Sequence, residues 1–117
     1  MIVDDHEMVA ASLVIALEDS VGIEIVGQAA NGSEGIEMVG KLLPDVVLMD
    51  MLMPVMDGIT ATRIIHQKYP QVKIIALTAL TSTADKAAIL EAGAHSFLQK
   101  ETHFTDEILE AIYKALG

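Results

Sequence analysis

Short apolar runs alternate along the chain with longer segments in which apolar residues recur every three or four positions. The runs are typical of strands and lie at 1–3, 23–29, 46–49, 72–78 and 96–99. The longer segments have the spacing of amphipathic helices. They lie at 7–17, 31–43, 59–69, 82–91 and 105–116. The pattern therefore predicts five strands that alternate with five helices.

Strict alternation of strands and helices favours an α/β fold with a parallel sheet covered on both faces. The run at 46–49 is wholly apolar, as expected for a strand that is buried on both faces. Right-handed crossovers then bring the carboxyl ends of all strands to one edge of the sheet. With no linker or repeat in 117 residues, we expect one domain over 1–117.

The helix boundaries carry local signals. Asn31 followed by Glu34 predicts a cap for the second helix, and Pro44 follows its end. Asp57 and Gly58 follow the third strand, and Asp57 is interpreted as a turn residue. Gly93 ends the fourth helix.

The first strand is unusually short, because Asp4 and Asp5 follow only three apolar residues. Three residues pair poorly with neighbouring strands. This suggests that residues are missing ahead of the strand, or that Met1 replaces part of it, and either case affects the placement of Asp4 and Asp5.

Composition excludes several classes of function. The formal charge of −10 opposes binding to a phosphate backbone by this chain alone. The absence of cysteine excludes disulfides and thiolate metal sites. No apolar run reaches the roughly 18 residues of a membrane span, and the acidic start is unlike a signal peptide, so we expect a cytoplasmic protein without membrane contact.

Chemistry-bearing residues stand at the ends of four predicted strands. They are Asp4, Asp5, Asp50, Thr78 and Lys100. Carboxylates that converge at one edge repel one another unless a cation lies among them, and Mg²⁺ prefers such oxygen ligands together with phosphate oxygens. With a lysine and a hydroxyl nearby, the set indicates phosphoryl chemistry, in which a carboxylate can serve as nucleophile.

Several motifs follow one another in a fixed order along the chain. They are Val3-Asp4-Asp5, Leu48-Met49-Asp50 with Met53-Pro54 and Met56-Asp57-Gly58, Leu77-Thr78-Ala79, Gly93-Ala94, and Phe97-Leu98-Gln99-Lys100. Over essentially the whole chain, this ordered set resembles one family, the receiver domain of bacterial two-component response regulators. Details such as Lys100-Glu101 are most similar to the subgroup that carries a LuxR-type helix-turn-helix DNA-binding domain. The resemblance implies a flavodoxin-like doubly wound (βα)5 sandwich with strand order 2-1-3-4-5.

The resemblance also implies roles for individual residues. Asp50 is expected to be the phosphoacceptor, and Lys100 to pair with it and then with its phosphoryl group. Asp5 is expected to bind Mg²⁺ directly, Asp4 through water, and Leu52 through its backbone carbonyl. Asp50 is also expected to be a ligand of the ion.

A second implied group forms the conformational switch. The Thr78 hydroxyl is expected to move to the phosphoryl oxygen, and the Phe97 ring to turn inward behind it. The implied partners are a sensor histidine kinase and a second copy in a phosphorylation-dependent homodimer. DNA is reached only through an effector domain that this chain does not contain. A stand-alone single-domain regulator is the alternative.

Two rival classes are weaker. A Mg²⁺-dependent phosphatase with an aspartyl nucleophile needs an acid two residues after Asp50, where Leu52 stands. A nucleotide-binding domain needs a glycine-rich phosphate loop after a strand, which is missing. His6, His66, His95 and His103 lack metal-ligand spacing, although His6 is close enough to the acids to affect them.

Overall fold

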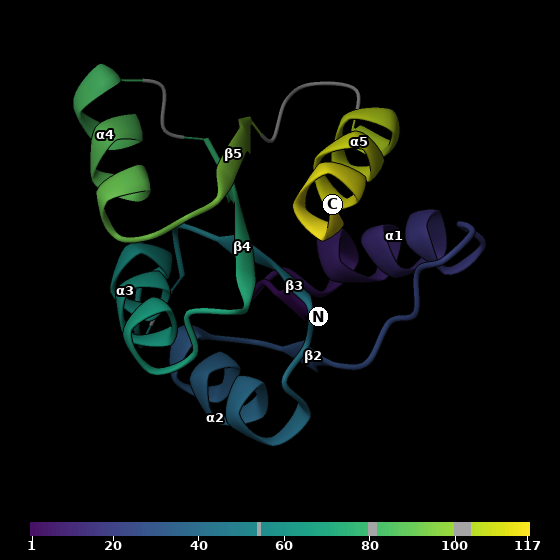
Figure 1. Ribbon diagram of the computed structural model, residues 1–117, viewed down its shortest axis with the longest axis horizontal. Coiled ribbons are helices and arrows are strands. Elements are labelled where there is room, and N and C mark those ends of the chain that lie inside the picture. Colours follow the sequence, from purple (N-terminus) through teal and green to yellow (C-terminus); the bar gives the residue numbers. More distant parts are fainter. Residues whose placement is uncertain (54, 80–81, 100–103) are drawn as a thin grey trace.

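The structure is a computed structural model that describes residues 1–53, 55–79, 82–99 and 104–117 (Figure 1). Strands and helices alternate along the chain, as the apolar pattern predicts. The elements are β1 (Ile2–Val3), α1 (Glu7–Glu18), β2 (Gln28–Ala29), α2 (Gly32–Leu42), β3 (Val46–Asp50), α3 (Gly58–Lys68), β4 (Lys73–Thr78), α4 (Thr83–Glu91), β5 (Ser96–Gln99) and α5 (Phe104–Leu116).

The strands form one parallel sheet in the order β2-β1-β3-β4-β5. The expected α/β class and the doubly wound strand order 2-1-3-4-5 are therefore confirmed. β3 and β4 pair over five residues from Val46 with Lys73 to Asp50 with Leu77. β3 thus lies at the centre of the sheet, and its carboxyl end lies at the edge where loops leave for the helices.

Helices cover both faces of the sheet, with α1 and α5 on one face and α2, α3 and α4 on the other (Figure 1). Two aliphatic cores result. The core under α1 and α5 includes Ile2, Leu13, Leu48, Ile75 and Ile108. The core on the opposite face includes Val3, Val39, Met49, Ile65 and Ile89. Alternate residues of β1 and β3 therefore face opposite layers, as the period of two requires.

The predicted helix caps are confirmed. The Asn31 side chain accepts a hydrogen bond from the Glu34 amide at 2.9 Å, which satisfies a donor at the start of α2. Leu43 ends α2 in the left-handed conformation, with φ of 45°, and Pro44 follows. Gly93 has φ of 112° after α4.

The predicted strand at 23–29 is mostly wrong. Only Gln28 and Ala29 pair in the sheet, with Ile2 and Val3. A strand exists only where a neighbour supplies hydrogen bonds, and β1 offers two residues. The residues at 23–27 therefore precede β2 without strand structure of their own.

The two tyrosines lie in different layers. Tyr69 follows α3 and packs against the core under α2, α3 and α4. Tyr113 lies on α5, and its hydroxyl donates to the Val21 carbonyl oxygen at 2.7 Å. Among the described residues, no helix has the length and apolar character to cross a membrane.

Candidate functional site

The register of the sheet brings the predicted acids together. Val3 of β1 lies beside Met49 of β3, so Asp4 and Asp50 follow side by side at the carboxyl edge. Both side chains are buried, with Asp50 only 2% exposed. Thr78, also buried, lies one residue beyond Leu77, the partner of Asp50 on β4. The convergence expected from a parallel sheet is therefore present.

Asp4, Asp5, His6 and Asp50 each place one ligand atom within 4.8 Å of the others. The His6 Nδ1 atom lies 3.1 Å from an oxygen of Asp4, 3.1 Å from an oxygen of Asp5 and 3.8 Å from an oxygen of Asp50. The His6 backbone amide also donates to Asp4 Oδ1 at 2.8 Å, which fixes the start of the β1–α1 loop. The sequence alone indicated only that His6 lies near the acids.

The donor set of this acidic cluster fits a hard divalent cation. Three carboxylates supply oxygen atoms within a radius that one ion can bridge. Mg²⁺ takes one or two carboxylates and keeps several waters or phosphate oxygens, so the cluster has more negative charge than the ion needs.

The loop after β3 holds Asp50 in place. The Leu52 amide donates to Asp50 Oδ1 at 3.2 Å, and the Gly58 amide donates to the Met51 carbonyl oxygen at 3.0 Å. A Cβ at Gly58 would collide with the Asp50 carbonyl oxygen and with Met51. Leu52 itself is 54% exposed. Pro54, which the family motif includes, lies outside the described residues.

Asp57 is a helix cap, in agreement with its interpretation as a turn residue. Its carboxylate accepts hydrogen bonds from the Thr60 amide at 2.8 Å and from the Thr60 hydroxyl at 3.0 Å. The hydrogen bond from the Thr60 amide is the largest cause that lowers the pKa of Asp57 below its usual range. Asp57 therefore fixes the start of α3 and does not belong to the acidic cluster.

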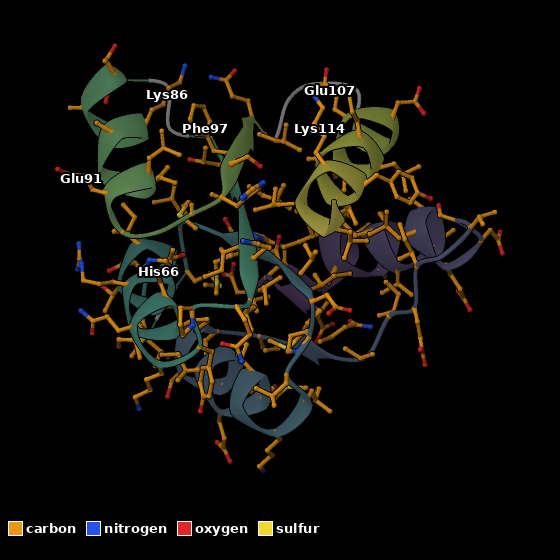
Figure 2. All side chains as sticks on the ribbon, viewed as in Figure 1. His66, Lys86, Glu91, Phe97, Glu107 and Lys114 are labelled. Atoms are coloured by element: carbon orange, nitrogen blue, oxygen red, sulfur yellow. The ribbon has the colours of Figure 1, made fainter. Side chains whose placement is uncertain are left out.

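Phe97 lies on β5, half-buried, with the Lys86 ammonium of α4 5.7 Å from its ring centroid (Figure 2). This distance is within the reach of a cation–π contact. β5 pairs with β4 such that Thr78 lies beside Gln99 and Ala76 beside Phe97. Thr78 and Phe97 are thus on adjacent strands, two residues apart in register.

The remaining predicted site residue, Lys100, lies outside the described residues, so its pairing with Asp50 stays a prediction. Sequence reasoning missed Lys86 altogether. Its contact with Phe97 depends on how α4 packs beside β5, and no motif in the sequence marks it.

The structure is thus a doubly wound α/β domain with an acidic cluster at the carboxyl end of its central strand, β3. The sequence matches the family model described as the response regulator receiver domain over residues 1–113. The chain belongs to this family.

Curated relatives of the chain are regulators of the same kind. The transcriptional regulatory protein LiaR of Bacillus subtilis is 44% identical over 98% of this chain, and the response regulator protein VraR of Staphylococcus aureus is 40% identical over 97%. This chain spans 54% of the length of each of these curated relatives.

Solved structures show the same fold. A LuxR-family response regulator from Aurantimonas has a TM-score of 0.93 at 32% identity and covers 99% of this chain and 82% of its own. The receiver domain of NarL from Mycobacterium tuberculosis has a TM-score of 0.90 at 29% identity and covers 99% of this chain and 94% of its own.

Proposed function

We propose that this receiver domain accepts a phosphoryl group on Asp50 from a sensor histidine kinase. The observation that carries the proposal is the buried Asp50 carboxylate at the carboxyl end of the central strand, beside Asp4 and Asp5. A carboxylate in this position can be reached by a phosphodonor at the edge of the sheet, while the strand and loop hold it still. Family membership supports the same role, because response regulators act as switches.

In the proposed reaction, one Asp50 carboxylate oxygen attacks the phosphorus of the kinase phosphohistidine. A new P–O bond forms and the P–N bond to the imidazole breaks. The bonding electron pair stays on the imidazole nitrogen, which is then available for protonation. Asp5 would hold Mg²⁺ directly, Asp4 through water, and Leu52 through its carbonyl oxygen. When bound, the ion neutralises charge on the transferring phosphoryl group.

The phosphoryl group adds about −1.5 to −2 charge beside already acidic residues. We propose that Lys100 pairs with this charge and that the Thr78 hydroxyl donates to a phosphoryl oxygen. Phe97 would then turn inward, which requires it to leave the Lys86 ammonium that now lies over its ring. The switch thus links the charge at β3 to the surface of β5 and α4.

The output of the switch concerns a longer protein. Because the chain spans only 54% of its regulatory relatives, we propose that 1–117 is the receiver domain of a cytoplasmic transcription regulator. Phosphorylation would promote homodimerisation and so control a DNA-binding region. A stand-alone regulator that acts through protein contacts is the alternative.

The test is incubation of the domain with Mg²⁺ and acetyl phosphate, followed by intact mass measurement. We expect a gain of one phosphoryl group, which is lost in Asp50→Asn and on removal of Mg²⁺ with a chelator. Asp57→Asn is the matched control, because it changes an acid of the same loop that only caps α3. It should be modified as fully as the unaltered domain.

Two results would contradict the proposal. One is modification that persists in Asp50→Asn. The other is sustained hydrolysis of added phosphoesters with no stable gain in mass, which would instead support a phosphatase.

A further inference from the structure

A lysine of α4 lies over the aromatic ring of Phe97. The Lys86 ammonium is 5.7 Å from the ring centroid, and the two side chains come from α4 and β5, which pack against each other (Figure 2). An ammonium within about 6 Å of a ring centroid is attracted by the negative charge on the face of the ring. Both residues are half-buried, so water and salt screen this attraction less than they would between exposed side chains.

Lys86 differs in its partner from two other lysines on helices. Lys41 on α2 and Lys114 on α5 each pair with a glutamate four residues earlier, at 3.2 Å and 3.0 Å. Three and four residues from Lys86, where a helical partner would stand, the chain holds Ser82, Thr83, Ile89 and Leu90. None of these is acidic. Within the described part of the chain, Lys86 accordingly forms no ion pair, and its charge is directed at the ring.

The acid next to Lys86 in the sequence, Asp85, is held at the start of α4. The Ser82 hydroxyl oxygen accepts a hydrogen bond from the Asp85 amide at 3.0 Å, and the same hydroxyl donates to the Asp85 carboxylate. Consecutive residues of a helix do not face each other. Asp85 therefore caps the helix and leaves the Lys86 ammonium to Phe97.

Phe97 and Thr78 lie on the same face of the sheet. Ala76 pairs with Phe97 and Thr78 with Gln99, and alternate residues of a strand point to one face. Ala76 and Phe97 both belong to the core under α2, α3 and α4. Because the side chain of Ala76 is a single methyl group, the register partner of Phe97 presents little bulk to a ring that turns inward. The contact that the ring gives up in turning is the one with Lys86.

We propose that Lys86 is a positioning residue that holds the Phe97 ring in its outward orientation and so limits how readily the unmodified domain is phosphorylated. This inference rests on the proposed function, with Asp50 as phosphoacceptor and Thr78 and Phe97 as the switch. The ring leaves the ammonium before it turns inward, so the contact stabilises the outward orientation alone. An interaction made in only one of two states shifts the equilibrium between them toward that state.

The size of the effect follows from the strength of the contact. A cation–π contact at a partly exposed site shifts an equilibrium about two- to fivefold. Where the outward orientation dominates, loss of the contact raises the fraction of inward rings by this factor. The rate of a reaction that proceeds through the inward form rises in proportion to that fraction.

The first experiment observes the ring in the unphosphorylated domain. The chain has two phenylalanines, which are labelled with fluorine, and the Phe97→Leu variant identifies the Phe97 resonance. Fluorine saturation-transfer spectra then measure the fraction of molecules in the minor ring orientation. This fraction should rise about two- to fivefold in Lys86→Met, which keeps an apolar side chain of similar length, and return to its original value in Lys86→Arg, which keeps a cation. An unchanged fraction in Lys86→Met would overturn the proposal.

The second experiment measures the rate of phosphorylation by acetyl phosphate and Mg²⁺, followed by intact mass. Lys86→Met should gain the phosphoryl group about two- to fivefold faster than the unaltered domain, and Lys86→Arg at the original rate. Lys114→Met is the matched control, because it removes a lysine charge that is paired with Glu110 on α5. Its rate should equal that of the unaltered domain, and an equal rate in Lys86→Met would overturn the proposal.

A double-mutant cycle shows whether Lys86 acts through the ring. In the Phe97→Leu background, Lys86→Met should leave the rate unchanged, because the partner of the ammonium is already gone. The same acceleration in that background would overturn the proposal. Failure of the proposed function looks different, since the unaltered domain would then gain no phosphoryl group or Asp50→Asn would still be modified. The fluorine measurement decides the role of Lys86 in that case too, because it needs no phosphorylation.

Discussion

The acidic cluster should make the metal-free domain less stable than a variant that lacks one of its charges. In Asp5→Asn, two repulsions disappear, those with Asp4 and Asp50, across no more than 4.8 Å. At this distance two unit charges interact by about 3.5 kcal/mol at an effective dielectric constant of about 20. The lost contact with His6, whose side chain is 59% exposed, offsets about 1 kcal/mol at most.

We therefore expect Asp5→Asn to raise the metal-free free energy of unfolding by about 1–3 kcal/mol, after solvent screening reduces the two repulsions. Urea unfolding followed by circular dichroism, with a chelator and with Mg²⁺, measures this difference. Ligand binding stabilises the folded state by about 2.7 kcal/mol at a hundredfold excess over Kd, so Mg²⁺ should stabilise the unaltered domain more than the variant.

Asp19→Asn is the charge-matched control, because Asp19 is exposed at the far end of α1. It should change the free energy of unfolding by less than about 0.5 kcal/mol and leave the Mg²⁺ effect intact. The reasoning fails if Asp5→Asn is no more stable than the unaltered domain in chelator, or if Mg²⁺ stabilises both equally.

Three further predictions concern residues that lie around the acidic cluster or at the start of the chain. Asp57→Ala should lower the free energy of unfolding by about 1 kcal/mol at neutral pH. Because the pKa of Asp57 in the folded chain is lowered from 3.8, this difference should disappear as the pH falls from 3.8 through that lowered pKa. Denaturant unfolding across this pH range measures the difference. Gly58→Ala should destabilise by about 2 kcal/mol or more and slow phosphorylation by acetyl phosphate, because its Cβ would displace the Asp50 main chain. Denaturant unfolding should show the lower free energy of unfolding, and intact mass measurement should show the slower phosphorylation. Phosphorylation at the unaltered rate would contradict this prediction. Burial lowers the pKa of the Met1 amino group to about 6 in the folded chain, from 8.0. The unfolded chain therefore keeps this proton to higher pH, so the metal-free free energy of unfolding should rise between about pH 6 and pH 8. Denaturant unfolding across this range measures the rise, and acetylation of Met1 should flatten it.

The strands that form the centre of the sheet could be predicted from the sequence because each is long, apolar and buried on both faces. β3 and β4 are such strands, and their ends fixed the expected position of Asp50 and Thr78. The strand at 23–29 was predicted too long, because its own residues favour a strand but its partner is short. Strand pairing depends on two segments, whereas the composition of a segment describes only that segment.

In the site, too, some features follow from the sequence and others only from the structure. The convergence of Asp4, Asp5 and Asp50 follows from parallel strand direction alone, so the sequence predicts it. The position of the His6 ring depends on the turn between β1 and α1, and that of Lys86 on the packing of α4. Such contacts require coordinates, because sequence spacing does not determine the directions of side chains in loops or between layers.

The chain has no tryptophan and only two tyrosines, so its intrinsic fluorescence comes from one ring on each side of the sheet. Tyr69 reports from the layer of α2 and α3, and Tyr113 from the layer of α1 and α5. Single Tyr→Phe variants would therefore separate the optical signals of the two layers without any added label. The domain thus carries its own spectroscopic means of following whether an event at the acidic edge reaches one face of the sheet before the other.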